Sequence, residues 1–371
     1  MAESGWWQGV GGFETSPPQQ HSAQRPNSKN KGSLRSNLCY DSSTTGHQKA
    51  HPLFTRALTL IFSLTALLHT PAHANTDIPA WLQRHVGTGS NQIAPIVLQR
   101  ARALYHENLR KRKTRNGCYY AMDATRPSTA SNGQALPRFY TICEKTGIFR
   151  ATSAGYGNGR KIPRANFKNG RQCAKNFSNA EGSNLTMGGA YLTAESRTSF
   201  KGYYSQGGHL KPFLRTFLLF DGVGETKNAR ERAIGGHQAA FLKWSCRKKM
   251  PTSPYADDEG YVPVGRLVDY TSGRSNGCTT WNASATSEIL SQVDRNPITL
   301  YIYPEGDDIK AVAKAVKKGQ SLSAADLYWN ASCFKAIGAP TFWPKRKLQP
   351  TINAWRRSLP KTEARPLPIC N

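Results

Sequence analysis

Apolar residues recur with two different periods along this chain, helical at first and extended later. Residues 93–113 carry apolar side chains three or four positions apart and end in a basic run, which is typical of an amphipathic helix. From Cys118 the spacing predicts strands over residues 119–123 and 139–143, joined as a hairpin across a long loop that contains proline and glycine. Antiparallel pairing of these strands would place Cys118 opposite Cys143.

Most of the chain between this hairpin and residue 303 also has strand-like patterns. Further strands are expected over residues 147–155, 187–193, 200–205, 210–220, 232–237, 239–244 and 298–303. The Gly-, Asn- and basic-rich residues 155–186 are expected to form a long loop.

Two helices complete the expected elements. One covers residues 283–293, with Asn282 as its N-cap, and one covers residues 307–317, before a tail rich in tryptophan and proline. The fold class is therefore predicted as a mainly β domain over residues 115–304, preceded by a helical lead over residues 75–114. An α/irregular C-terminal extension is expected over residues 305–371.

The first seventy-four residues differ from the rest. Residues 1–52 are rich in Gly, Ser, Gln, Asn and His without a hydrophobic period, which predicts disorder. A basic residue, an apolar run over residues 57–68 and an Ala-x-Ala sequence ending at Ala74 then predict a signal peptide over residues 53–74. The run is too short for a membrane span, which needs ~20 residues. The alternative to a signal peptide is a buried helix. We expect export to the periplasm or cell envelope and, since a signal peptide normally begins a chain, that residues 1–52 are not translated.

The charge is strongly positive. The chain has 50 basic and 23 acidic residues, a net charge of +27, and residues 1–74 hold six of the basic and three of the acidic residues, which leaves +24 after cleavage. Such a charge favours an anionic partner, and export excludes nucleic acid as the expected one. Anionic wall polymers or a lipid surface remain candidates, and a general contribution to solubility is an equal alternative.

Seven of the eight cysteines remain after cleavage at Ala74, which is an odd number. An oxidising compartment favours three disulfides and one free thiol, and no CxxC or Cys/His spacing predicts a metal site or another cofactor. The hairpin predicts Cys118–Cys143, the C-terminal extension predicts Cys333–Cys370, and elimination leaves Cys173–Cys246. The remaining Cys278 could be a nucleophile, a buried inert thiol or half of an intermolecular bridge.

The local sequence favours the nucleophile. Cys278 ends a short polar turn between two glycines, in which the backbone can bend sharply and its N–H groups can face outward. Arg274 adds positive charge to this turn. An exposed thiol with a lowered pKa is expected there.

A thiol nucleophile needs a base, and few histidines are available. Of nine histidines, five precede residue 74, and His85 and His106 lie in or near the helical lead. His209 and His237 remain in the β region. His237 follows a strand-like run and two glycines, so it is the expected base.

Five segments, in order, resemble the murein L,D-transpeptidase catalytic domain family, which belongs to the YkuD-like clan of cysteine transpeptidases. They are Phe177-Ser-Asn179 with Gly182-Ser183 and Thr186-Met-Gly188, residues 203–209, Asn228-Ala-Arg-Glu-Arg-Ala-Ile-Gly-Gly-His237, Gly273-Arg-Ser-Asn-Gly-Cys278, and residues 298–304. The likeness covers residues 115–304. The chain departs from the family at Gln238, where a glycine is usual, at Asn276, where Trp or His is usual, and at Thr279-Thr280, which replace Pro-Ala.

The resemblance implies a β-sandwich-like catalytic domain that acts on peptidoglycan stem peptides. Cys278 would attack the carbonyl of the L-centre of a diaminopimelate residue, D-Ala would leave, and an amine or water would resolve the acyl-enzyme. His237 would take the thiol proton, and the N–H groups around Gly277 and Cys278 would hold the oxyanion.

Three further residues are expected on the substrate side of this site. Arg274 would bind a substrate carboxylate, and Ser275 would orient either the turn or His237. His209 belongs to the family-like turn near the substrate. Two other functions remain open: a hydrolase, either L,D-carboxypeptidase or amidase, with the same thiol, and a catalytically silent, basic wall-binding protein.

Overall fold

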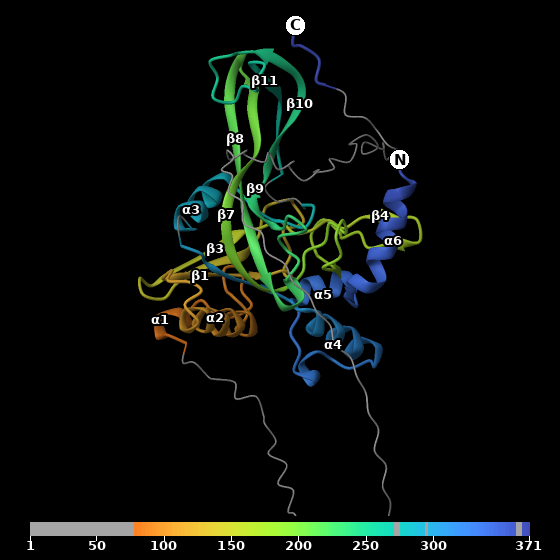
Figure 1. Ribbon diagram of the computed structural model, residues 1–371. Coiled ribbons are helices and arrows are strands. Elements are labelled where there is room, and N and C mark those ends of the chain that lie inside the picture. The colour runs from red at the N-terminus through yellow and green to blue at the C-terminus, as the bar shows by residue number, and fades with distance from the viewer. Residues whose placement is uncertain (1–77, 271–274, 294–295, 361–365) are drawn as a thin grey trace, which may run out of the picture. The chain divides into compact units, whose positions relative to one another are not determined.

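The computed structural model describes residues 78–270, 275–293, 296–360 and 366–371. The predicted disordered segment, the predicted signal peptide and Arg274 lie outside the described residues. The described part is mixed α/β, with more strand than helix, and its main element is a ten-stranded sheet (Figure 1).

Eight strands form the continuous path of this sheet. Their order is β12 (Thr279–Trp281), β9 (Gly235–Gln238), β8 (His209–Val223), β7 (Gly189–Gln206), β13 (Thr299–Tyr303), β1 (Cys118–Asp123), β2 (Pro137–Cys143) and β3 (Ile148–Ser153). β10 (Ala240–Lys249) pairs with β11 (Tyr261–Asp269), and β11 also pairs with β7. Because β9 continues almost directly into β10, the four strands β7, β8, β10 and β11 extend together as the upper lobe seen in Figure 1.

The two faces of the central strands bury different clusters. Tyr119 and Ala121 of β1 pack under α2 (Pro95–Arg110), with Val97 and Leu98 of that helix also fully buried. The short helix α1 (Ala80–Gln83) lies in the same lead. The amphipathic helix expected over residues 93–113 is thus confirmed, and it covers one face of the sheet.

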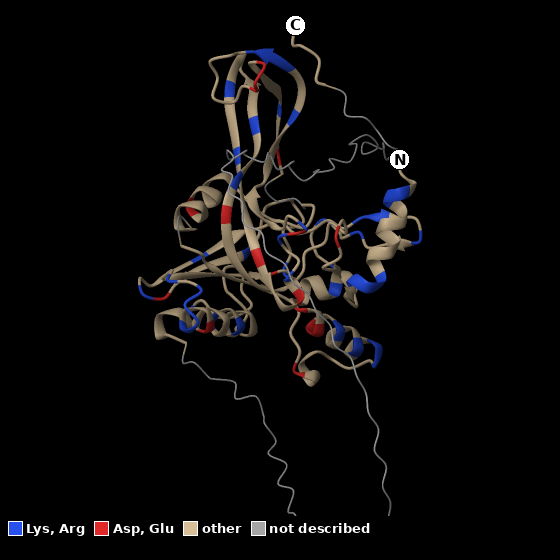
Figure 2. Ribbon diagram, viewed as in Figure 1, with Lys and Arg blue, Asp and Glu red and all other residues tan. Residues whose placement is uncertain are grey.

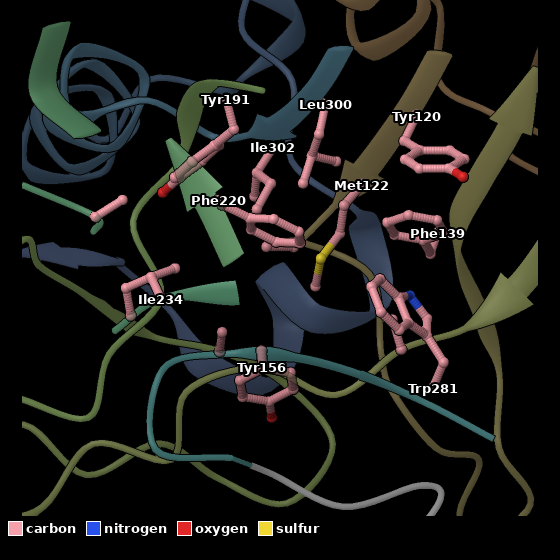
Figure 3. Packing of buried hydrophobic residues seen from close by; sticks show 14 of the residues in the cluster. Tyr120, Met122, Phe139, Tyr156, Tyr191, Phe220, Ile234, Trp281, Leu300 and Ile302 are labelled. Atoms are coloured by element: carbon pink, nitrogen blue, oxygen red, sulfur yellow. The ribbon is translucent and has the colours of Figure 1, made fainter. Parts of the chain in front are cut away.

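The opposite face holds the larger core. Met122, Ile302 and Phe220 point toward one another there, with Trp281 beside Phe139 (Figure 3). Alternate residues of β1 and β13 serve the two clusters, since successive side chains of a strand point to opposite faces. These central strands are therefore apolar at nearly every position.

Several predicted elements are confirmed. β1 and β2 pair antiparallel with Cys118 opposite Cys143. α3 spans Ala283–Val293, and Asn282 Oδ1 accepts a hydrogen bond of 2.8 Å from the Ala285 N–H, as an N-cap does. The separate strands expected over residues 187–193 and 200–205 are one strand, β7, whose pairing with β8 shifts register between Thr193 and Ser196. That irregularity breaks the period on which the prediction relied.

Several elements were missed. β11 was not predicted, and the tail after α4 (Gly306–Lys317) contains α5 (Ala331–Ile337), β14 (Thr341–Phe342) and α6 (Lys345–Ser358). β14 pairs with β6 (Asn176–Phe177) inside the expected long loop, which also contains the small hairpin of β4 (Lys161–Ile162) and β5 (Ala165–Asn166). Ile309, Val312 and Trp329 belong to the larger core, so the extension packs into the same compact unit as the sheet.

The described cysteines form three disulfides, and two of the predicted pairings are wrong. Cys118–Cys143 is confirmed, whereas Cys173 pairs with Cys333 and Cys246 pairs with Cys370. The extension folds back onto two separate regions, so its two cysteines bond to the body of the protein rather than to each other. Three disulfides are typical of proteins of oxidising compartments. No helix among the described residues is both long and apolar enough to cross a membrane.

Candidate active site

Cys278 and His237 lie on one face of two neighbouring strands. β12 runs parallel to β9, with Thr279 opposite Gly236 and Thr280 opposite His237. Since alternate residues share a face, Cys278 and His237 are on the same side, and Cys278 stands beside Gly235. Trp281 points to the other side, into the core (Figure 3), where a Cβ on Gly236 would come within 1.9 Å of its ring.

Ser275 and Gly277 shape the turn that presents the thiol. The Ser275 hydroxyl donates a short hydrogen bond to the Cys278 carbonyl and accepts one of 3.2 Å from the Gly277 N–H. Gly277 has φ +114, which L side chains rarely adopt, and a Cβ there would lie 3.1 Å from the Leu185 carbonyl oxygen. Ser275 therefore orients the turn rather than His237.

The long loop before β7 holds this turn from outside. The Ser275 N–H donates to the Tyr156 carbonyl, and the Ser275 carbonyl accepts from the Asn158 N–H, both at 2.8 Å. Thr186 Oγ1 donates to the Gly277 carbonyl at 3.3 Å. The turn is thus fixed by contacts with residues about 90 to 120 positions earlier in the chain.

The thiol is free but buried, so the expected exposure is wrong. Cys278 takes no part in a disulfide and is 9% exposed. Its Sγ donates to the Ala233 carbonyl at 3.6 Å. Burial raises the pKa of the thiol, and the opposing effects of a Gly235 backbone hydrogen bond and of the charges on Arg215 and Arg232 do not outweigh it. The expected lowering of the thiol pKa is therefore also wrong for this state.

His237 is a neutral, buried imidazole. It is 7% exposed, and burial together with the charge of Arg215 lowers its pKa to about 3. Its Nδ1 lies 2.8 Å from the Gln238 carbonyl, to which a neutral ring donates from that nitrogen. Nε2 is then the basic nitrogen. Among the described residues, no hydrogen bond joins this ring to the Cys278 thiol.

Arg215 is a functional candidate that the sequence analysis missed. It lies on β8 two residues before Phe217, the partner of His237 in the sheet, so it shares the face of the thiol and the imidazole. The guanidinium is 8% exposed, bonds to Ser199 Oγ at 2.8 Å and to the Ala240 carbonyl at 3.0 Å, and lies 4.3 Å from the Phe200 ring centroid. An arginine within the apolar run of β8 was the signal that could have revealed it.

Arg232 is a second cation beside the thiol. It is half-buried, and its Nη2 donates to the Leu185 carbonyl at 2.7 Å, next to the turn that Leu185 supports. Its charge, like that of Arg215, favours a thiolate at Cys278. The site therefore pairs a buried thiol with two positive charges, and Arg274 lies outside the residues whose positions are described.

His209 lies far from this site. It begins β8 at the tip of the β7–β8 hairpin, opposite Gln206, after a turn in which Gly207 and Gly208 both have positive φ. It is exposed, and eight residues of extended strand, about 27 Å, separate it from Phe217. The structure does not bring His209 to Cys278.

Other sites were sought in the described part of the chain. It contains no group of three or more His, Cys, Asp or Glu side chains that could hold a metal ion. Two surface hollows lie elsewhere, one beside Glu195 and Arg230 and one beside Gln134 and Asn282, and neither is lined by Cys278 or His237. Comparison with protein-family models, with curated proteins and with solved structures found no match.

Proposed function

We propose that this protein is an exported cysteine acyltransferase of the L,D-transpeptidase type, with a YkuD-like catalytic domain that acts on peptidoglycan stem peptides in the periplasm or cell envelope. One observation carries the proposal. Among the described residues, the single cysteine outside the disulfides ends a glycine- and serine-shaped turn and shares a strand face with a neutral histidine and a buried arginine.

The first step forms an acyl-enzyme. Sγ of Cys278 attacks the carbonyl carbon of the diaminopimelate L-centre, and Nε2 of His237 takes the thiol proton. The C–N bond to D-Ala then breaks, and the imidazolium returns the proton to the departing amine. Because the resting groups are a neutral thiol and a neutral imidazole, the proton moves as the sulfur attacks and not before.

Two cations make this transfer easier. Arg215 and Arg232 favour negative charge on the sulfur, and neither forms an ion pair with a carboxylate among the residues that the structure describes. The oxyanion would be held by N–H groups at Gly277 and Cys278, and the Gly277 N–H would exchange its Ser275 partner for the oxyanion. Arg274 remains our candidate for binding a substrate carboxylate.

The second step decides between transferase and hydrolase. An amine from a second stem peptide gives a crosslink, whereas water gives a carboxypeptidase or amidase product from the same thioester. Both outcomes use the same residues.

A catalytically silent wall-binding protein is the second candidate. The observation that favours it is the burial of the thiol, which raises its pKa, beside a histidine that stays neutral well below pH 6. In that case the positive charge of the mature chain would carry the function.

The test is incubation with purified murein, followed by mass spectrometry of the released muropeptides. Crosslinks between two diaminopimelates support the transpeptidase, and loss of D-Ala without crosslinks supports the hydrolase. Cys278→Ser should abolish either product, and His237→Ala should lower the rate by about 10²–10⁴. Murein left unchanged by a folded wild-type protein would overturn the enzymatic proposal in favour of the silent binder.

A further inference from the structure

One surface of the protein carries positive charge that the fold leaves largely unpaired. We call it the α6 surface; it consists of the basic residues of the β4–β5 hairpin region and of α6, namely Arg160, Lys161, Arg164, Lys168, Lys345, Arg346, Lys347, Arg356 and Arg357. Figure 2 shows blue at both ends of α6 and on the neighbouring β4 segment, with little red beside them. All but Arg160 are exposed.

The local sequence offers almost no counter-charge. Residues 158–186 contain six basic residues and one acidic residue, and residues 343–360 contain five basic residues and no acidic one. The acidic residue is Glu181, which pairs with Arg356 at 3.0 Å. The net charge of these two segments is thus strongly positive after every internal carboxylate is counted.

Four positions of the α6 surface are locally unfavourable. Lys345, Arg346 and Lys347 form the first turn of α6, where the helix dipole disfavours cations, and no acidic residue stands in that turn. Arg164 turns the β4–β5 hairpin with φ +70, a conformation that glycine or asparagine adopts more easily.

Like charges also meet on this surface. Burial, and then the charge of Arg356, lower the pKa of Arg160, which lies 5.0 Å from the Trp355 ring centroid. Apart from the Arg356–Glu181 pair and the contact of Arg160 with the Trp355 ring, no contact by which these cations stabilise the fold is described, so an anionic partner is the physical reason that remains for them.

The α6 surface is continuous with the Cys278 turn. Leu348 and Ile352 of α6 pack with Leu185, and the Leu185 carbonyl lies against Gly277. On the other side, the Asn184 amide donates to Asn276 of the turn at 3.0 Å. One loop thus contacts both α6 and the Cys278 turn, so a polymer bound along α6 would lie close to that turn.

We infer that the α6 surface is a docking site for the free carboxylates of peptidoglycan stem peptides. The inference rests on the proposed function for the choice of polymer. Many carboxylates repeated along one strand match a row of exposed lysines and arginines, and the bound strand presents its stem peptides to Cys278. The surface thus supplies affinity for the polymer, while the turn supplies the chemistry.

The experiment compares two fourfold variants, each in the Cys278→Ser protein so that turnover cannot alter the polymer. The test variant carries Lys345→Gln, Arg346→Gln, Lys347→Gln and Arg357→Gln. The control carries Lys211→Gln, Lys243→Gln, Lys248→Gln and Arg266→Gln, four exposed cations of the upper lobe for which no ion pair is described. Both lose the same charge, so their difference reports location alone.

Sedimentation with purified insoluble murein is the readout, with thermal unfolding to show that each variant is folded. The test variant should weaken binding by about tenfold or more, and the control by much less. Murein whose stem carboxylates have been amidated should bind the unmutated Cys278→Ser protein as weakly as native murein binds the test variant. Equal losses in the two variants, or unchanged binding to amidated murein, would overturn the inference.

Anionic lipid vesicles and a second activity assay complete the test. Vesicles that bind better than murein and that lose binding in the test variant would assign the surface to lipid and contradict our choice. In the Cys278 protein, the test substitutions should reduce turnover of murein more than turnover of a short soluble stem peptide, which cannot span the surface. If the unmodified protein turns over neither substrate, the proposed function fails, while the binding result still stands or falls separately.

Discussion

The helices α2 and α6 are both amphipathic and basic, but the fold treats their charges differently. On α2, Arg100 bonds to both carboxylate oxygens of Asp308, at 2.6 and 2.8 Å, and Arg102 bonds to both oxygens of Glu144, at 2.7 and 3.1 Å. On α6, one pair, Arg356–Glu181, is described for five basic residues. Positive charge in the α2 region is therefore paired within the folded structure, whereas most of the positive charge around α6 and Cys278 has no carboxylate partner among the described residues.

The largest expected effect concerns the ion-paired arginines of α2. Arg102→Met should lower the free energy of unfolding by about 3–5 kcal/mol, because it leaves the half-buried Glu144 carboxylate without its cation. Urea unfolding measures this. Arg357→Met on α6 is the matched control and should change stability by no more than about 0.5 kcal/mol. Similar losses in the two variants would remove the distinction between the helices.

The next effect concerns the disulfide that stabilises the region around the α6 surface. The Cys173–Cys333 disulfide joins the loop beneath the α6 surface to α5, in a region with few ion pairs. Replacing both cysteines by alanine should lower stability by about 2–4 kcal/mol. Thermal and urea unfolding of the double variant provide the measurement, and a loss below about 1 kcal/mol would show that packing alone holds this region.

A third prediction follows from the buried histidine. His237 has a pKa of about 3 in the fold and an ordinary value of 6.5 when unfolded, so the unfolded state binds the proton first as the pH falls. The neutral imidazole therefore leaves stability undiminished above pH 6.5. Between pH 6.5 and pH 3, preferential protonation of the unfolded state lowers the free energy of unfolding by about 1.4 kcal/mol per pH unit. His237→Asn should therefore flatten the acid limb of the stability profile between pH 6.5 and pH 4 relative to the unmutated protein. Parallel profiles would show that the imidazole is not buried in its neutral form.

The smallest expected effect lies at the thiol itself. Arg215→Met removes a charge that lowers the pKa of the Cys278 thiol, so alkylation of Cys278 by iodoacetamide at neutral pH should become slower. Arg215→Lys keeps the charge and should stay closer to the unmutated rate. Intact-mass measurements over time give both rates. An unchanged rate in the methionine variant would mean that Arg215 is only a structural residue of β8.

Sequence patterns correctly predicted the features that depend on residues close together in the chain. Alternation in residues 118–143 gave the first hairpin and its disulfide, and Asn282 gave the start of α3, because both depend on residues close in sequence. The neighbours Ser275, Gly277 and Cys278 were identified together for the same reason.

What depends on distant segments was missed. The burial of Cys278 comes from residues 156–186 and 233–235, and the cation beside it, Arg215, comes from the middle of an apolar strand. Helix α6 interrupts its pattern with Pro350 and is recognisable only because Leu348 and Ile352 meet Leu185. Tertiary contacts of this kind leave no period in the sequence.

The linkage of the disulfides has a consequence for how the chain must mature. The disulfides Cys173–Cys333 and Cys246–Cys370 interleave along the chain. Cys246 is the next of these four cysteines to emerge after Cys173, but it is not the native partner of Cys173. Oxidation in strict order of emergence would join Cys173 to Cys246, and that bond would have to be exchanged before the native pairs could form. Secretion in cells lacking a disulfide-exchanging enzyme should therefore yield protein locked in this consecutive pairing, with the segment around Cys333 left unattached. Correct folding of this protein therefore requires that the producing cell can exchange non-native disulfides.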